Sequence, residues 1–203
     1  MAAPKELVLR PAALEDAEAV APLLYAADQE VWDFIFAHGG ATATAYLADA
    51  FRQGTGLWGP KTCSAAVLDE RVVGVAAAWI PAEYPALERQ TSRHIRGYYG
   101  PLSAAQVVFR SLLVGTCMPP PKGDVAYLAA LGVADDLRGR GIGTALVTQV
   151  MAEARAQGLS SLTLDVSAAR PQAQRLYERM GFVVAGQSRF GRLQVARRME
   201  RRV

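Results

Sequence analysis

The segment 137–147, with the sequence LRGRGIGTALV, constrains the fold of this chain more than any other segment. It follows an apolar run at 125–133 that is typical of a buried strand. It precedes a helical pattern of apolar residues that ends near Gln157. Glycines at such a turn leave the first N–H groups of the helix available to an anion. The segment therefore predicts a phosphate-binding turn between a strand and a helix.

Two common nucleotide-binding motifs do not fit this segment. A P-loop would need a lysine after its last glycine, but Thr144 follows Gly143. A dinucleotide fingerprint would need a third small residue, and the position holds Thr144 counted from Gly139, or Leu146 counted from Gly141. Five residues also separate the strand from the first glycine, and the remaining chain is too short for a doubly wound sheet.

Hydrophobic periodicity and turn residues predict the order β-α-α-β-β-(insertion)-β-α-β-α-β-β, which is a mixed α/β fold. Strands are expected at 6–10, 63–68, 71–80, 125–133, 162–166, 182–187 and 193–200, and helices at 14–36, 42–53, 141–157 and 171–180. A helical insertion of about 82–123 stands between the third and fourth strands, and Gly100-Pro101 divides it into two helices. We expect one domain over 1–203.

Composition restricts the class of protein. Of the 203 residues, 51% are hydrophobic and 20% are charged, as in a globular domain. The longest apolar run, 72–80, is too short to span a membrane, and no secretory h-region opens the chain. The two cysteines and two histidines are too far apart for a metal site. We therefore expect a soluble, cytoplasmic protein with no bound metal and no disulfide.

Two motifs resemble the GNAT acetyltransferase superfamily. The pattern Arg138-x-x-Gly141-x-Gly143 after a strand resembles motif A of that family. The pattern Ala173-x-x-Leu176-Tyr177-x-x-x-Gly181-Phe182 resembles its later helix. The resemblance implies the GNAT fold (α+β), in which a mixed, mostly antiparallel central sheet is flanked by helices. It also implies acetyl-CoA (coenzyme A) as cofactor.

The resemblance further implies where the cofactor lies. The fourth strand should part from the fifth, and its free backbone groups and the glycine turn should hold coenzyme A. The residues implied are Leu131, Gly132, Val133, Arg138, Gly139, Arg140, Gly141, Ile142, Gly143, Thr144, Arg170, Ala173 and Tyr177. Arg170 stands where the family often has Asn, so two roles stay open for it: contact with a phosphate, or solvation of the helix start.

The implied reaction moves an acetyl group to a primary amine of a small molecule or peptide, by direct attack in a ternary complex. Tyr177 is the expected general acid, since a phenol can protonate a departing thiolate. The sequence does not identify the base: Glu83 is the first candidate for this catalytic role, and Tyr127 or a chain of water molecules are the alternatives. For each of these residues, a packing or surface role is the competing interpretation.

The acceptor is less constrained by the sequence. The aromatic and acidic side chains of Trp32, Asp33, Phe34 and Phe36 would suit an amine, although they would equally suit a helix packed on a core. The insertion could cover the acceptor or form a homodimer surface. Its basic side chains could meet an acidic acceptor or face solvent; they are Arg89, Arg93, His94 and Arg96.

Two other functions compete with an enzyme. One is a non-catalytic acyl-CoA-binding or regulatory module that has kept the cofactor turn. The other is a nucleic-acid partner that uses the arginines near the C-terminus, which are Arg189, Arg192, Arg197, Arg198, Arg201 and Arg202. Since Phe190 is the only aromatic residue among them, we do not expect a nucleic-acid partner. The short apolar run at 72–80 likewise gives no reason to expect a membrane partner.

Overall fold

A computed structural model of the protein describes residues 6–190 and 194–203, and a seven-stranded sheet runs through it. The strand order is β1-β2-β3-β4-β5-β7-β6. Every neighbouring pair is antiparallel except β4 and β5. The strands are β1 (Leu7–Pro11), β2 (Cys63–Leu68), β3 (Arg71–Trp79), β4 (Val125–Val133), β5 (Ser161–Ser167), β6 (Val183–Phe190) and β7 (Gln194–Arg202). The expected fold class is confirmed, and the seven strands follow one another along the chain as predicted. The predicted start of the last strand, Leu193, lies outside the described residues.

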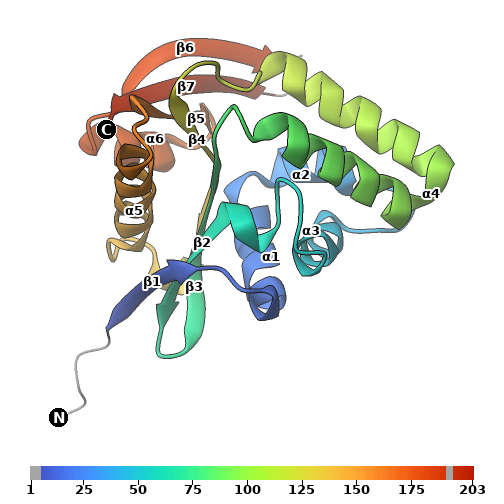
Figure 1. Ribbon diagram of the computed structural model, residues 1–203, viewed down its shortest axis with the longest axis horizontal. Helices are drawn as coiled ribbons and strands as arrows, with labels where there is room; N and C mark the ends of the chain where they lie inside the picture. Colours follow the sequence, from blue (N-terminus) through green and yellow to red (C-terminus); the bar gives the residue numbers. More distant parts are fainter. Residues whose placement is uncertain (1–5, 191–193) are drawn as a thin grey trace.

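Six α-helices are described, and they cover both faces of the sheet. They are α1 (Ala17–Ala27), α2 (Gln29–Phe36), α3 (Ala43–Arg52), α4 (Tyr84–Cys117), α5 (Ile142–Ala156) and α6 (Pro171–Arg179). Helices α1 to α4 lie on one side of the sheet, and α5 and α6 lie on the other (Figure 1). In the described part of the chain, no helix is both long and apolar enough to cross a bilayer.

The helical segment expected over 14–36 is two helices. Pro22 lies on the exposed side of α1 and does not end it, whereas Asp28 has a non-helical backbone (φ −159°, ψ 76°) that separates α1 from α2. The indole nitrogen of Trp32 donates a 2.8 Å hydrogen bond to the carbonyl of Leu24. This bond satisfies one of the carbonyls that the end of α1 leaves unpaired.

The sheet separates two hydrophobic cores. On one face, α1 packs on β3 and β4, and α3 packs on α1; the fully buried side chains of this core include Leu24, Leu47 and Val75. On the other face, α5 packs on the sheet through Leu146 and Val150. The sheet is thus covered on both sides, which fixes the positions of its strand ends.

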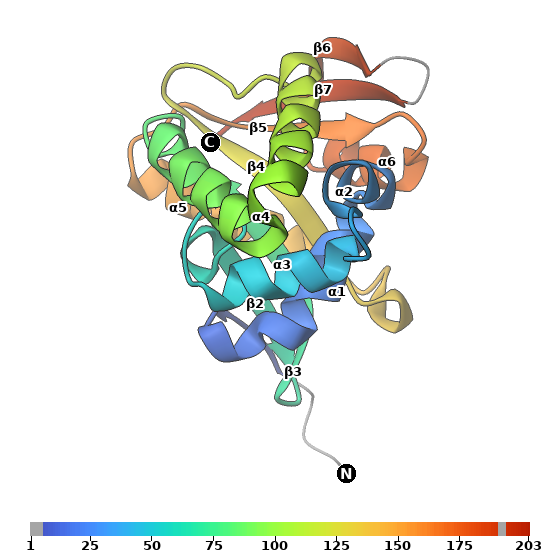
Figure 2. The same cartoon turned by 90° about the vertical axis from the view of Figure 1, so that its right-hand side faces the viewer.

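Helix α4 occupies the expected insertion and has a sharp bend. Gly100 has φ 73° and ψ 170°, outside helical geometry, and Pro101 follows it, so the helix consists of two halves that meet at an angle (Figure 2). The hydroxyl of Tyr99 donates to the carbonyl of Phe36 at 2.5 Å, and Arg110 donates to that of Phe34 at 3.1 Å. These bonds hold both halves against α2.

Strands β4 and β5 pair over only part of their length. Residues 125–128 of β4 pair with 161–164 of β5, and beyond that point no pairing joins the two strands. On its other side, β4 stays paired with β3, with Ala129 forming a bulge between Leu128 and Ala130. The second half of β4 therefore presents one free edge, as the family resemblance implied.

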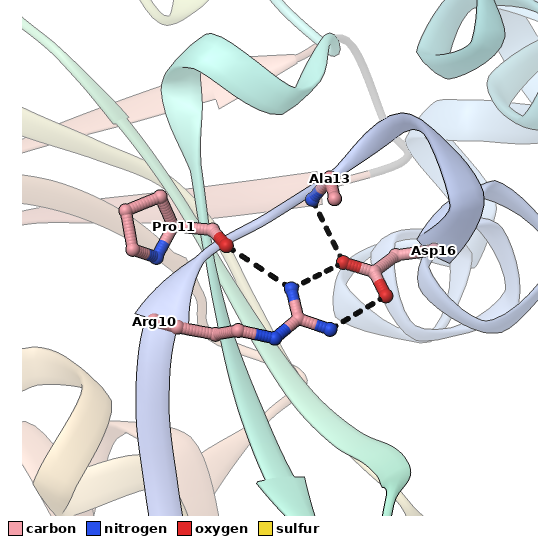
Figure 3. A network of polar contacts seen from close by, with 4 residues as sticks. All are labelled: Arg10, Pro11, Ala13 and Asp16. Atoms are coloured by element: carbon pink, nitrogen blue, oxygen red, sulfur yellow. Dashed lines mark hydrogen bonds and ion pairs between the residues drawn. The ribbon is translucent and has the colours of Figure 1, made fainter.

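An ion pair fixes the entry of the chain into α1 (Figure 3). The guanidinium of Arg10 donates to both carboxylate oxygens of Asp16, at 2.6 and 2.8 Å, and to the carbonyl of Pro11 at 3.1 Å. The carboxylate also accepts the backbone N–H of Ala13 at 2.8 Å. The hydrogen bonds from Arg10 lower the pKa of Asp16, whose side chain is only 9% exposed.

We expect Asp16→Asn to lower the free energy of unfolding by about 1–2 kcal/mol at pH 7, because hydrogen bonds to a charged group are lost. A carboxyl group whose pKa is lower in the folded protein than in the unfolded chain stabilises the fold at pH values above the unfolded pKa. That stabilisation disappears as the pH falls through the folded pKa. In urea unfolding, the difference from wild type should therefore shrink below about pH 3.8, the ordinary Asp value. The exposed pair Arg71–Asp136 supplies the control, since Asp136→Asn should change stability little. An unchanged difference at low pH would contradict this account.

Candidate active site

A groove of about 790 Å³ runs between the free end of β4, the start of α5 and α6. We call it the glycine groove; it is lined by Ala26, Leu131, Gly132, Val133, Leu137, Arg138, Gly139, Gly141, Ile142, Gly143, Thr144, Ala169, Arg170, Pro171, Gln172, Ala173, Arg175, Leu176, Tyr177 and Arg179. All residues expected to hold the cofactor line it except Arg140, which is exposed outside it. The fold thus brings together residues that are up to 46 positions apart in the sequence, from Leu131 to Tyr177.

The glycine turn points free N–H groups into this groove. Gly141 precedes α5 in a left-handed conformation (φ 84°), which glycine adopts without steric cost. Its carbonyl accepts the first helical hydrogen bond, from Ala145, so the amides of the preceding helical residues have no intrahelical partner. A Cβ on Gly143 would lie 3.5 Å from Leu176 and 3.7 Å from Leu131, so this glycine keeps the mouth between β4 and α6 open.

Arginines surround the groove on two sides. Arg138 pairs with Asp135 at 2.6 Å, while Arg175 and Arg179 have no ion pair among the described residues. These two side chains are four positions apart on α6 and thus share one face of the helix. The sequence analysis did not predict these two arginines as site residues. They follow Pro171 by four and eight positions, and this helical spacing could have placed them on the side of the helix that faces the groove.

The residues of the groove fit coenzyme A. A helix N-terminus with free amides and a favourable dipole suits a pyrophosphate, and arginines suit further phosphate oxygens. The free edge of β4 offers backbone groups to an amide-bearing chain such as pantetheine. For Arg170, the sequence left two roles open: contact with a phosphate, or solvation of the helix start. In the structure its guanidinium instead donates to the carbonyl of Ala26, at the end of α1, at 2.7 Å.

A second cavity, of about 520 Å³, lies on the α1–α4 side of the sheet. We call it the aromatic chamber; its lining includes Ala27, Asp28, Val31, Trp32, Ile35, Phe36, Leu57, Trp58, Trp79, Tyr84, Glu88, Ile95, Val108, Leu112, Met118, Tyr127, Leu128, Leu131, Asp165, Val166, Arg170, Ala173 and Tyr177. Of the predicted acceptor residues, Trp32 and Phe36 line it. Asp33 accepts a hydrogen bond from Tyr25 instead, and Phe34 lies under the guanidinium of Arg110.

Tyr177 stands where the two cavities meet, since it lines both of them. Its side chain is 7% exposed, and its ring packs edge-on against Phe182. Its hydroxyl has no hydrogen-bond partner among the described residues, and burial raises its pKa above the ordinary value. The phenol therefore remains protonated at neutral pH and has its proton available to a bound group.

The structure does not bring Glu83 to this point. Glu83 lines a separate hollow that it shares with Pro11 and Glu153, whereas Glu88, on the first half of α4, lines the aromatic chamber. A residue just before a helix and one five positions later point to different sides of its axis. Glu88 was not predicted as a site residue, because its position in the chamber depends on where α4 begins, and the sequence alone does not fix that position accurately.

The hydroxyl of Tyr127 already donates a hydrogen bond within the protein. Its hydroxyl donates to Asp165 at 2.9 Å, and Asp165 also binds Arg198 at 2.7 Å. Burial raises the pKa of Tyr127 well above its usual value, and the charge of Asp165 adds to this. A phenol held in its protonated form cannot act as a base, which removes Tyr127 from that role.

Four of the remaining candidate cations have structural partners among the described residues. In the C-terminal group, Arg198 joins Asp165 to the carbonyl of Pro119, while Arg197 and Arg201 bind Gln174 and the carbonyl of Met180. Arg192 lies outside the described residues. In the insertion, His94 contacts Asp49 at 2.7 Å, and neither it nor the arginines beside it line the chamber.

Comparison with known proteins places this geometry in context. The family model described as the acetyltransferase (GNAT) family matches residues 24–182. Sequence relatives include 5-NmdU N-acetyltransferase of Pseudomonas phage PaMx11, 40% identical over 58 residues, and human N-acetyltransferase 8B, 45% identical over 60 residues. These matches span 29% and 30% of this chain but only 39% and 26% of the relatives' lengths.

A solved structure shares the fold over almost the whole chain. The N-acetyltransferase from Staphylococcus aureus Mu50 superposes with a TM-score of 0.71 at 19% identity. The match covers 96% of this chain and 100% of that one. At 19% identity, this similarity shows a shared fold and nothing about the substrate.

Gly132 allows a prediction about how the groove is held. A Cβ at this position would lie 2.0 Å from the carbonyl oxygen of Leu23, so α1 packs directly on β4 there. We expect Gly132→Ala to force the two apart and to lower the free energy of unfolding by about 1–3 kcal/mol. In contrast, Gly97→Ala in α4 meets no atom within 4 Å and should stabilise by about 0.4–1 kcal/mol. Urea unfolding measures both, and equal stability of Gly132→Ala and wild type would contradict the packing argument.

Proposed function

The chain belongs to the GNAT acetyltransferase family, and from that premise we propose that it transfers the acetyl group of acetyl-CoA to a primary amine. We propose direct attack, with the donor in the glycine groove and the acceptor in the aromatic chamber. Acetyl-CoA is the acyl donor of this family, and its thioester supplies the group that an amine can take.

One observation carries this proposal: the two cavities meet. They share Leu131, Arg170, Ala173 and Tyr177. Direct transfer requires the two reactants to be held within contact distance of each other, and such alignment supplies a large part of the rate. A cofactor-binding module without an acceptor would not need the second cavity.

On the donor side, the chain contributes fixed dipoles and charges. The first amides of α5 bind phosphate oxygens, while Arg138, Arg175 and Arg179 neutralise their charge. The free edge of β4 beyond the Ala129 bulge presents backbone N–H groups toward the thioester. Such preorganised donors stabilise the negative charge that develops on a carbonyl oxygen under attack.

An acceptor that arrives as an ammonium ion first loses one proton to solvent, because only the neutral amine can attack the thioester. At the junction, Tyr177 donates the proton that the departing sulfur needs, and the second proton lost by the amine as the amide forms restores the phenol. Its unpaired hydroxyl is buried and protonated, so it can donate a hydrogen bond to a thiolate without first leaving another partner. Burial makes the phenol a weaker acid, and a thiolate at hydrogen-bond distance offsets this by stabilising the shared proton. Glu83 has no part in this proposal because it lines the separate hollow.

The phosphate-binding role of the turn predicts a charge-specific effect at Thr144, an exposed helical residue that lines the groove. We expect Thr144→Glu to weaken coenzyme A binding about tenfold or more relative to Thr144→Gln, because the two differ by one negative charge near the phosphates. Glutamate in the first turn favours the helix, so the loss cannot come from unfolding. Isothermal titration measures both affinities, and equal values would overturn the phosphate assignment.

Tyr177→Phe tests the proton donor. The ring still packs on Phe182 while the hydroxyl is removed, so we expect kcat to fall about 10²-fold with acetyl-CoA affinity changed less than about twofold. Steady-state rates and titration separate the two effects. A wild-type kcat would exclude Tyr177 as the acid. If wild type binds acetyl-CoA but acetylates no amine, the chain is instead a non-catalytic acyl-CoA-binding module.

A further inference from the structure

We propose that the acceptor is a primary monoamine carried on an aromatic or bulky apolar body, and that Glu88 binds its ammonium group. This inference rests on the proposed function, because it names the substrate class that the aromatic chamber takes. It follows from the walls of the chamber and from the partners of the three carboxylates that line it; the guanidinium of Arg170, which also lines it, donates to the carbonyl of Ala26.

The walls of the chamber are mainly apolar. Three tryptophans, Trp32, Trp58 and Trp79, contribute to them, and the rings of Trp32 and Trp58 meet edge-on at 4.6 Å. Aliphatic side chains of α2, α4 and β4 fill the space between these rings. A wall of this kind binds an apolar body. The hydroxyl side chains that also line the chamber are fewer than its apolar ones, so an apolar ligand is favoured over a sugar.

Three carboxylates line the chamber, but two of them are engaged by the protein. Asp165 is 4% exposed, and its charge is offset by Arg198 and by the hydroxyl of Tyr127. Asp28 also interacts within the protein. Glu88 lines the chamber without an ion pair among the described residues, so the chamber has one carboxylate free for a cation.

Aromatic rings connect Glu88 to the sheet. Tyr84 packs on Trp79 at 4.8 Å, and Trp79 packs on Tyr127 at 4.7 Å. Burial, and then the charge of Glu88, raise the pKa of Tyr84, while Tyr84 in turn contributes to the raised pKa of Tyr127. The carboxylate therefore adjoins a row of ring faces, an arrangement that favours an ammonium group.

The same features argue against other amines. A polyamine carries several ammonium groups, and each would need its own carboxylate or water to avoid a desolvation cost. One free carboxylate satisfies one ammonium. The acceptor best matched to the chamber is thus a single amine with a hydrophobic remainder.

Binding of three small probes to the coenzyme A complex tests this directly. The probes are 2-phenylethylamine, 2-phenylethanol, which lacks the charge, and ethylamine, which lacks the body. Quenching of tryptophan fluorescence reports occupancy, because three tryptophans line the chamber. We expect 2-phenylethylamine to bind about tenfold tighter than either fragment, since it gains both apolar burial and a charge-assisted contact.

Glu88→Gln should lower the affinity for 2-phenylethylamine about tenfold, to that of 2-phenylethanol, and leave coenzyme A affinity unchanged. Glu30→Gln, the same change at an exposed position of α2 outside the chamber, should alter neither affinity. Equal loss in both variants, or no loss in Glu88→Gln, would overturn the role of Glu88.

Acetylation rates then separate this inference from the proposed function. With saturating acetyl-CoA, kcat/KM for 2-phenylethylamine should exceed that for spermidine and for glucosamine at least tenfold. Equal or faster acetylation of spermidine or glucosamine would overturn the substrate class while supporting the transferase. Binding of acetyl-CoA without acetylation of any amine would overturn the proposed function itself.

Discussion

The separation of β4 from β5 after Leu128 and Leu164 is the constraint on which the rest of the site depends. While the strands pair, their backbone groups are satisfied by each other; once they part, those of β4 face open space on that side. The gap lies between the glycine groove and the aromatic chamber, and its walls include residues of both. A sheet paired along its full length would close this passage and leave two unconnected hollows.

Helix α1 links this gap to the stability of the fold. Its backbone packs on β4 at Gly132, where no side chain has room, and its last carbonyls accept hydrogen bonds from Trp32 and Arg170. Trp32 comes from the wall of the chamber and Arg170 from the junction of the cavities. The end of α1 is therefore stabilised by residues of the site, so that changes at Arg170 would affect both the junction and the local fold.

The glycine groove could be predicted from the sequence because its turn is built mainly from backbone. Gly139 and Gly141 have the positive φ that this turn requires, and their spacing is visible in the chain. The aromatic chamber is built from side chains of several elements, and no local pattern shows which of them meet. Trp79 and Tyr127 face each other through the strand register, and Glu88 joins them only because α4 begins at Tyr84.

The same difference explains why Glu83 was predicted as a candidate base while Glu88 was not predicted at all. In the sequence, Glu83 lies just past the predicted third strand. A helix begins there, and its first turns carry Glu83 and Glu88 to different cavities. Within the chamber, Glu88 also differs from Asp165. The charge of Asp165 is neutralised by Arg198, whereas Glu88 has no ion pair among the described residues. Among the carboxylates that line the chamber, Glu88 is thus the one for which the described residues provide neither an ion pair nor a hydrogen bond, and it is the group on which the proposed recognition of a single ammonium depends.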